Sequence, residues 1–447
     1  MVLQLLDAVP PARQRIQNPL TLSRQFAALS LVFSGSEGIF LNWAGRPRVT
    51  AQFMRDTEYD VAVVGGGLAG SAAAAMIGRS GLTACLIDPH RDYPADFRCE
   101  ALTQGQLDLL AAAGLLDQTR AVMTASNGLW IARRGRIVER RDSCLYGIHH
   151  RQLVMRLRDL ASPRVPLVEG NIAAIENGPH RQVLRLTDGR SFSARLVVLA
   201  TGGNVRLRRA LGMTQTEYSP VHSVSLGFDV VPAANGRFSV PALTYHAEST
   251  AARMAYLSLF PIGSTMRANL FVYRGVHDPW LKQLQRHPRA ALTGLMPNLQ
   301  NVIGDYEIAG PIQVRPIGLY EVSNAVQPGV VLVGDAFGNS CPAAGTGCDK
   351  LLVDVERLCN HHLPHWFATE GIPAAKIRSF YDDPVKTARD ARSRTHAFYT
   401  RAVAVNDDLK WRAIRLAKGV VPRLLALPLA AARSASRRAT VDPGIAA

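Results

Sequence analysis

The chain has 447 residues, of which 47% are hydrophobic and 7% aromatic, and its formal net charge is +16. This length allows a large core and about two domains, and the composition excludes disordered and fibrous classes. No apolar run reaches the roughly 18 residues of a membrane span, and residues 1–15 lack the apolar core of a secretory signal. The six cysteines have no paired spacing. We therefore expect a cytoplasmic protein with no metal site and no disulfide framework.

The first 57 residues precede the first predicted strand and form an N-terminal extension of unassigned role. They contain Pro10, Pro11 and Pro19, followed by an apolar patch at residues 29–33.

A glycine-rich segment at residues 65–70 follows an apolar run, 61–64, that predicts a buried parallel strand. Residues 71–77 predict a helix, which gives the strand, turn and helix of a dinucleotide-binding unit. The glycines allow the tight turn, the approach of a pyrophosphate and close packing of helix on strand, while the helix start favours an anion. The residues predicted to bind cofactor here are Gly65, Gly67, Leu68, Ala69 and Gly70.

A second predicted strand, residues 83–87, ends at Asp88. Asp88 follows Gly70 at close to the spacing of about 20 residues at which an acid accepts hydrogen bonds from a ribose. We expect Asp88 to bind that ribose.

Two further apolar strands end in short polar or glycine-containing motifs. Residues 196–199 lead to Thr201 and Gly202, and residues 330–333 lead to Gly334 and Asp335. Between them, residues 213–319 contain alternating segments, such as 222–228 and 266–273, that predict strands of an antiparallel sheet.

A basic and apolar stretch lies near the end of the chain, at residues 409–438. Its composition is that of an interfacial helix on an anionic membrane. The alternative is a helix that docks on the enzyme with its charges in water, and Pro422 and Pro428 argue against one uninterrupted helix. We expect no nucleic-acid binding, because no base-reading motif accompanies the charge.

Residues 58–400 resemble flavoproteins of the p-hydroxybenzoate hydroxylase type, with the related geranylgeranyl reductases and flavin-dependent halogenases. The resemblance rests on the glycine-rich segment, on residues 96–102, on the Gly334–Asp335 motif and on the turn at 342–347. It implies an α/β fold with a glutathione-reductase-type, Rossmann-like FAD-binding domain, interleaved with an antiparallel-sheet substrate domain and followed by C-terminal helices. The FAD-binding domain would comprise 58–125, 150–212 and 320–400, the substrate domain 213–319, and a basic helical tail 401–447.

The same resemblance implies roles for residues outside the first motif. Arg98 would reach the FAD phosphates, with Glu100 close by, and Asp335 would accept from the ribityl hydroxyls. The turn would start a helix whose positive end faces the flavin. The residues implied to bind FAD in this second constellation are Gly334, Asp335, Pro342, Gly345, Thr346 and Gly347.

The chain departs from the family pattern at several positions. Thr201 stands where the family has an aspartate, so either NAD(P)H or a partner reductase supplies electrons. Asp349 replaces an asparagine near the flavin, and Lys350 is its expected partner. The family's arginine before a predicted helix falls at either His150 or Arg151. The family's helical aspartate falls at Asp354.

The resemblance implies a monooxygenase that hydroxylates an electron-rich small molecule with O₂ through a flavin C4a-hydroperoxide. Alternatives are a reductase or dehydrogenase of a prenyl or lipid substrate at a membrane surface, and a non-catalytic redox-sensing flavoprotein. Halogenation is disfavoured because the Trp-x-Trp-x-Ile-Pro signature is absent. No catalytic residue is identified. The candidates for the substrate side are Tyr245, His246, Tyr256, Phe260 and Pro261.

Overall fold

The computed structural model describes residues 57–233 and 236–417. The predicted N-terminal extension and most of the basic tail lie outside these residues. Among the described residues, no helix combines the length and the apolar character needed to cross a bilayer.

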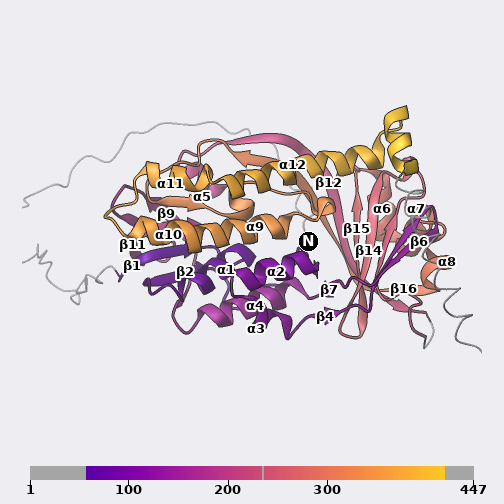
Figure 1. The fold of residues 1–447 in the computed structure, drawn as a ribbon, viewed down its shortest axis with the longest axis horizontal. Coiled ribbons are helices and arrows are strands. Elements are labelled where there is room, and N and C mark those ends of the chain that lie inside the picture. The colour runs from indigo at the N-terminus through magenta and orange to yellow at the C-terminus, as the bar shows by residue number, and fades with distance from the viewer. Residues whose placement is uncertain (1–56, 234–235, 418–447) are drawn as a thin grey trace, which may run out of the picture. The chain divides into compact units, whose positions relative to one another are not determined.

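The first sheet contains the strands on either side of the glycine-rich turn (Figure 1). Parallel strands run in the order β8-β2-β1-β11, β17 pairs parallel with the C-terminal end of β11, and β10 and β9 extend the sheet antiparallel. Its strands are β1 (Thr57–Val64), β2 (Ala84–Asp88), β8 (Leu167–Glu169), β9 (Ile172–Glu176), β10 (Gln182–Leu186), β11 (Ser191–Leu199) and β17 (Val330–Leu332). The apolar runs predicted at 61–64, 196–199 and 330–333 are thus confirmed as neighbouring buried strands.

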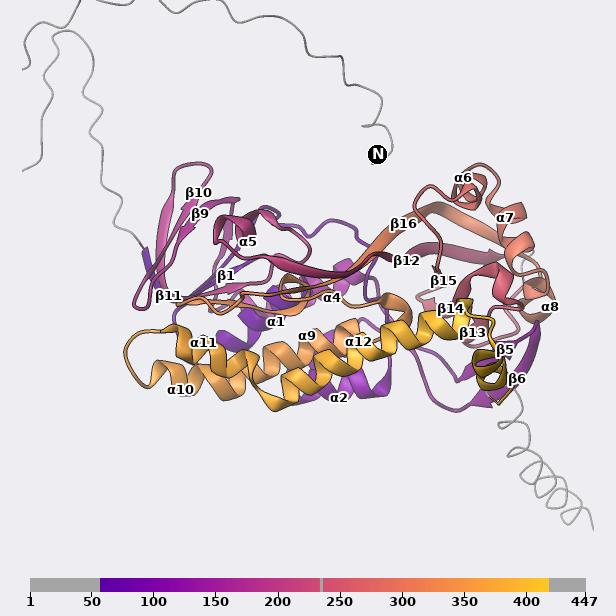
Figure 2. The ribbon, with the colours of Figure 1, turned by 90° about the horizontal axis from the view of Figure 1, so that it is seen from above.

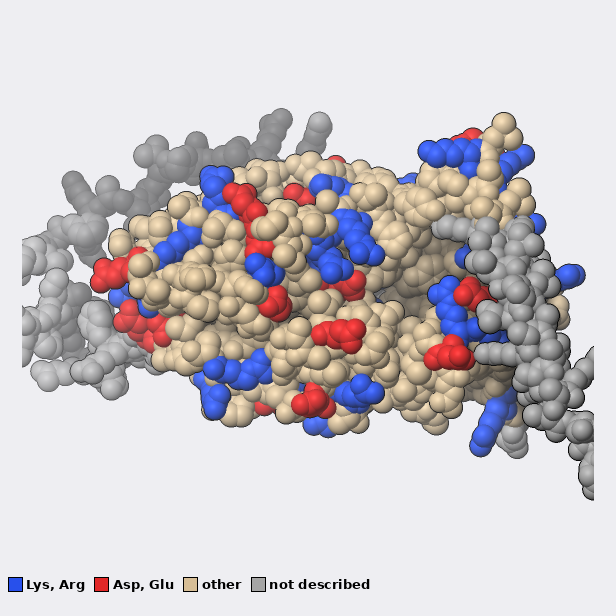
Figure 3. All heavy atoms as spheres, in the orientation of Figure 1, with Lys and Arg blue, Asp and Glu red and all other residues tan. Residues whose placement is uncertain are grey.

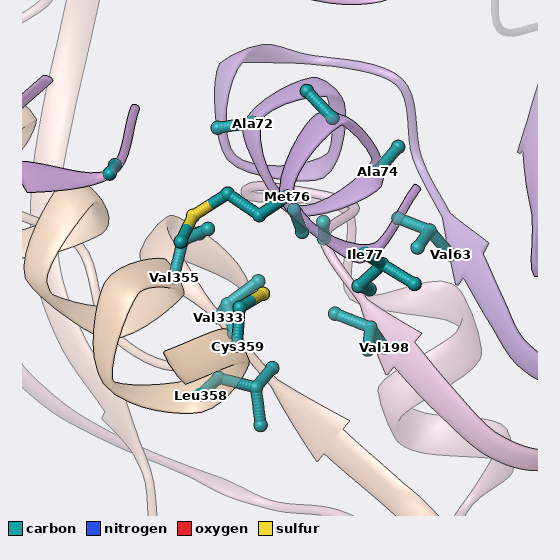
Figure 4. Packing of buried hydrophobic residues seen from close by; sticks show 14 of the residues in the cluster. Val63, Ala72, Ala74, Met76, Ile77, Val198, Val333, Val355, Leu358 and Cys359 are labelled. Atoms are coloured by element: carbon teal, nitrogen blue, oxygen red, sulfur yellow. The ribbon is translucent and has the colours of Figure 1, made fainter. Parts of the chain in front are cut away.

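Strand β1 alternates its side chains between two apolar clusters, one on each face of the sheet. Helices cover one of these faces. Val61 and Val63 pack with the helices, whereas Ala62 and Val64 pack on the opposite face. Figure 4 shows Met76 beside Val355 and Ile77 pointing toward the strands. The covering helices are α1 (Leu68–Ile77), α2 (Gln104–Ala112), α3 (Leu116–Arg120), α4 (His150–Ala161) and α9 (Gly347–Glu356), and α5 (Arg206–Ala210) contributes Leu207 to the other cluster.

A second sheet follows the order β16-β12-β15-β14-β13-β5-β6 and is antiparallel except between β13 and β5. Side chains from α6, α7 and α8 pack on one of its faces. Its elements are β5 (Leu129–Arg133), β6 (Arg136–Arg141), β12 (Gln215–Pro232), β13 (Leu243–His246), β14 (Met254–Ile262), β15 (Thr265–Val272), β16 (Tyr306–Val322), α6 (Pro279–Arg286), α7 (Pro288–Leu295) and α8 (Leu299–Ile303). β5 and β6 belong to this sheet, although the sequence interpretation assigned residues 126–149 to neither domain.

The remaining elements are a small sheet and the C-terminal helices. The sheet has the order β3-β7-β4, with β3 (Ala101–Leu102), β4 (Thr124–Ala125) and β7 (Tyr146–Gly147). A π-helical turn at Arg357–His362 leads to α10 (Leu363–Phe367), α11 (Ala374–Tyr381) and α12 (Pro384–Val405). Figure 2 shows α12 running alongside α9 and on toward the second sheet, where it contacts β14.

The leucine-rich segment from Leu107 to Leu116 belongs to two helices rather than one. Gly114, at φ +66°, breaks the run between α2 and α3. A left-handed residue ends a helix, which the apolar spacing alone did not reveal.

Candidate active site

The glycine-rich turn after β1 adopts a conformation that side chains would block. Gly65 has φ +99°, and a Cβ there would lie 2.7 Å from the carbonyl oxygen of Ala200. A Cβ on Gly70 would lie 1.8 Å from the carbonyl oxygen of Gly65. The segment 68–70 begins α1, whose N-cap residue Gly67 provides no side-chain cap. The first N–H groups of α1 are therefore available to an anion.

Asp88 lies at the end of β2, where the sequence predicts a ribose partner, and its carboxylate is held by the surrounding chain. Gly66 N–H donates to Oδ2 at 2.6 Å, His90 N–H donates to Oδ1 at 3.0 Å, and the Arg158 guanidinium lies 3.1 Å from Oδ1. Arg158 also donates two hydrogen bonds to the carbonyl oxygen of Gly66. This arginine on α4 ties the glycine-rich turn to Asp88.

Sequence reasoning missed Arg158. Its side chain is only 6% exposed, which is rare for an arginine without a structural or binding role. The available signal was its place on α4 eight residues after His150, on the face that carries Leu153, Val154 and Leu157.

Arg98 and Asp335, far apart in the chain, meet in the structure. The Arg98 guanidinium lies 3.8 Å from the Asp335 carboxylate and also pairs with Asp96, which lies 3.5 Å from Arg315. Burial raises the pKa of Asp96, but Arg98 and Arg315 outweigh that effect and hold the pKa below its usual value. A positively charged group thus stands where the two motifs converge.

The turn that carries Asp335 rests on a buried network of charges. The Asp354 carboxylate accepts a hydrogen bond from Gly334 N–H at 2.9 Å, and Lys350 donates to the Gly338 carbonyl at 3.0 Å. Lys386 on α12 lies 3.1 Å from Asp354 and 2.9 Å from Asp390. Lys350, Asp354, Lys386 and Asp390 are called the lysine–aspartate network below. It is nearly closed to solvent, so each charge depends on the others.

The turn before α9 places Gly345 at φ +68° and Thr346 at the N-cap, with Pro342 at its start. Asp349 in the first turn of α9 accepts from Gln106 Nε2 at 2.7 Å and lies 3.4 Å from Arg389. The expectation that Lys350 would pair with Asp349 is wrong, because successive helical side chains diverge and Lys350 points into the lysine–aspartate network.

The structure separates the two candidates at the start of α4. His150 is buried and lines the cavity, whereas Arg151 is half exposed and donates to the Tyr93 carbonyl at 2.6 Å. The His150 ring lies against the Cys99 backbone at the cavity wall. Burial lowers the pKa of His150 to about 4, so its ring is neutral near pH 7.

One cavity of about 1080 Å³ joins these groups to the second sheet. Its walls at the first sheet include Gly65, Gly67, Leu68, Ala69, Asp88, Arg98, Asp335, Pro342, Gly345 and Gly347, all predicted cofactor-binding residues. Gly70, Gly334 and Thr346 lie next to them in the same turns and do not line it.

Figure 3 shows one face of the molecule, on which basic and acidic side chains are interspersed and no single-sign surface dominates.

The second sheet forms the roof of this cavity, and strand alternation decides which side chains face it. Thr244, Ser258 and Asn269 are cross-strand neighbours and line the cavity as a polar row. His246, Tyr256 and Phe271 line it as a parallel aromatic row, which Ser225 extends on β12. Tyr256 is edge-on to both His246 and Phe271, with ring centroids 5.9 and 5.0 Å apart.

Two of the five substrate-side candidates, His246 and Tyr256, line the cavity. Tyr245 points to the opposite face, where its hydroxyl contacts Glu248. Phe260 packs with Leu145 beside the cavity, and the Pro261 carbonyl abuts Gly147.

The side chains and backbone of this cavity fit a dinucleotide cofactor. The Thr201 hydroxyl, at the cavity wall, is buried and unpaired within the described residues. A Cβ on Gly67 would meet nothing closer than the Tyr93 hydroxyl at 3.8 Å, so a ligand has room to approach the backbone. A cavity with an unpaired polar atom at this turn suits a polar, extended ligand.

Comparisons with known proteins agree with this geometry. Residues 58–361 match the family model described as FAD binding domain. Squalene epoxidase 1 of Arabidopsis thaliana is 25% identical over 77% of this chain and 67% of its own length. The 3-demethoxyubiquinol 3-hydroxylase of Escherichia coli K12 is 24% identical over 68% of this chain and 80% of its own.

Among solved structures, p-nitrophenol 4-monooxygenase PnpA from Pseudomonas putida DLL-E4 shares the fold. Its TM-score is 0.65 at 16% identity, over 84% of this chain and 98% of that one.

The chain spans only 61% to 67% of the length of the first three squalene-oxidising relatives. The α/β fold with its second sheet and C-terminal helices is confirmed, and FAD is the cofactor. The chain belongs to the FAD-binding domain family.

Proposed function

We propose that this chain is a monooxygenase that transfers one oxygen atom of O₂ to an electron-rich, unsaturated small molecule held beneath the second sheet. The observation that best supports this proposal is one continuous cavity. It joins the glycine-rich turn, Arg98 and Asp335 to the polar and aromatic rows of the roof. A cofactor on one wall and a substrate on the other would lie next to each other there.

The proposed cofactor contacts follow from the residues that line the first-sheet wall. The start of α1 and Arg98 bind the pyrophosphate, because both supply donors and positive charge. Asp88 accepts from the ribose, and Asp335 accepts from the ribityl chain. The start of α9 binds the carbonyl edge of the flavin. Bound FAD supplies the stored electrons and the activation of O₂.

The chain contributes charge stabilisation and exclusion of water. The positive end of α9 stabilises negative charge at the flavin edge, and Gln106 and Arg389 compensate the Asp349 carboxylate in its first turn. The aromatic row offers apolar edges and faces to an unsaturated substrate, which keeps water from the reacting atoms.

The test begins with purified protein that carries FAD. Anaerobic addition of NADH or NADPH should bleach the flavin absorbance, and readmission of oxygen should consume O₂ and restore it. Gly70→Ala should abolish FAD binding, because its Cβ would collide with Gly65. Gly105→Ala is the matched control, since no atom lies within 4 Å of its Cβ.

The outcome with nucleotides identifies the electron source. Bleaching by either nucleotide supports direct reduction of FAD by NAD(P)H. A bound small-molecule substrate should accelerate this bleaching. Bleaching by dithionite but by neither nucleotide would assign reduction to a partner reductase and would implicate Thr201. Protein that retains no FAD after reconstitution would contradict the proposal.

We also propose that residues 409–438 contact anionic membranes. Residues 409–417, the described part, are helical, and Leu409 and Leu416 are 84% and 51% exposed. An exposed apolar side with neighbouring Lys410 and Arg412 suits a headgroup surface. Sedimentation with phosphatidylglycerol vesicles should retain the full chain, whereas a chain ending at residue 408 should remain in the supernatant. Equal sedimentation of both would contradict this contact.

A further inference from the structure

Two polar side chains in the cavity roof have no hydrogen-bond partner in the described chain. They are the Asn269 side-chain oxygen on β15 and the Ser225 hydroxyl on β12. Asn269 is 5% exposed and Ser225 is 2% exposed, and both line the cavity. Buried polar atoms are almost always paired in proteins, so an unpaired pair facing a cavity indicates a ligand that completes them.

The two groups are close enough to act on one ligand. Asn269 on β15 lies opposite Gly227 on β12. Ser225, two residues before Gly227 on β12, lies opposite Phe271 on β15. They are therefore diagonal neighbours on one face of an antiparallel pair, about 7–8 Å apart at their Cα atoms. A single polar group or two adjacent ones can reach both.

The pair lies at the cofactor end of the roof. The Phe97 ring, next to Arg98, packs against Gly227 so closely that a Cβ there would lie 2.5 Å from it. Arg267, two residues before Asn269 on β15, pairs with Glu100 at 2.8 Å. The segment that carries Arg98 therefore touches the roof beside Asn269.

We propose that Asn269 and Ser225 form a subsite for a hydroxyl group of the substrate and that they select hydroxyl-bearing unsaturated molecules over hydrocarbons. The inference rests on the proposed function and deepens it. A hydroxyl donates to the Asn269 oxygen and accepts from Ser225, whereas a hydrocarbon would leave both unpaired and desolvated. Sites that hydrogen-bond a substrate group reject analogues that lack it.

The chemical role is specificity and positioning. The hydroxyl would fix the ligand's orientation at the β12–β15 end, while its unsaturated body lies along Phe271 and Tyr256. A hydrocarbon has no group that fixes this orientation.

The test measures binding to the FAD-loaded protein without turnover. Titration of 2-naphthol and naphthalene, followed by the change in flavin absorbance, gives two dissociation constants and their ratio. Wild-type protein should bind 2-naphthol about tenfold to a hundredfold more tightly. Asn269→Leu and Ser225→Ala should each bring the ratio toward one, mainly by weakening 2-naphthol.

Ser223→Ala is the matched control, since it removes another buried hydroxyl from β12 that contacts Cys341 and does not line the cavity. Its ratio should equal that of wild type. A wild-type ratio near one, an unchanged ratio in both roof variants, or no binding of 2-naphthol at its solubility limit would overturn the subsite. Loss of FAD from wild type would instead count against the proposed function, because FAD content is measured separately.

Discussion

The two walls of the cavity satisfy their polar groups in opposite ways. Beneath the Gly334–Asp335 turn, the lysine–aspartate network pairs buried charges and ties them to the backbone. In the roof, Asn269 and Ser225 are buried and unpaired. The lysine–aspartate network pairs its charges without a ligand, as the support of a permanent cofactor requires, whereas the two roof side chains are completed by what binds there.

Removal of one charge from the network should have the largest effect on stability. Lys386→Met would leave the buried carboxylates of Asp354 and Asp390 to share Lys350 as their one remaining cation in the network, which costs about 3–5 kcal/mol. The free energy of unfolding in urea should fall by that amount. Lys282→Met, at an exposed position on α6, should change it by less than about 0.5 kcal/mol. Equal effects of the two substitutions would show that the network carries no stability.

Acid should weaken the cofactor wall through His150. Its folded pKa of about 4 lies below the unfolded value of 6.5, so the unfolded state binds the proton more readily. The stability that depends on a neutral His150 is fully present above pH 6.5 and is lost as the pH falls toward 4. The loss amounts to about 3 kcal/mol.

His150→Gln should remove this dependence when cofactor-free proteins are unfolded in urea between pH 7.5 and 4.5. The exposed His277 provides the control, because His277→Gln should follow the wild-type curve. A His150→Gln curve parallel to wild type would show that the imidazole is not the responsible group.

Loss of Arg98 should weaken FAD more than it weakens the fold. Arg98→Met removes a donor to the phosphates and a charge beside Asp335, which predicts about tenfold to a hundredfold weaker FAD binding. Fluorescence quenching of FAD would measure the dissociation constant. Arg91→Met replaces an exposed arginine just after β2 and should bind FAD as wild type does. Unaltered affinity in Arg98→Met would exclude a phosphate contact.

The smallest effect on stability is expected in the roof. Asn269→Leu replaces an amide whose oxygen is already unpaired by an apolar group of similar size, so the free energy of unfolding should change by less than about 1 kcal/mol or rise. This outcome, set against Lys386→Met, would sharpen the contrast between the two walls. A loss of several kcal/mol would mean that Asn269 has a structural partner.

Short-range patterns predicted the parts of the molecule that local chemistry determines. The turn at 65–70 needs residues without side chains, and the buried strands need continuous apolar runs, so both are readable from the sequence. Strand parity in the roof was also readable: Tyr245 and His246 are adjacent and must point to opposite faces, and the sequence interpretation did not use this alternation.

Long-range partners were not readable. Arg158 reaches Gly66, and Lys386 reaches Asp354, across separations that no local pattern encodes. The pairing of Asp349 was wrong for the same reason, since its partners Gln106 and Arg389 come from other helices. Likewise, only the packing of α4 separates His150 from Arg151.

The strand order of the first sheet has a consequence for biosynthesis. Thr57 at the start of β1 pairs with Phe192, and β11 pairs in turn with β17, which begins at Val330. A ribosome therefore releases the glycine-rich turn long before the strands and the lysine that support the flavin wall. Non-local pairings of this kind slow folding, and the wall that faces the flavin can form only after Val330 and Lys386 have been synthesised.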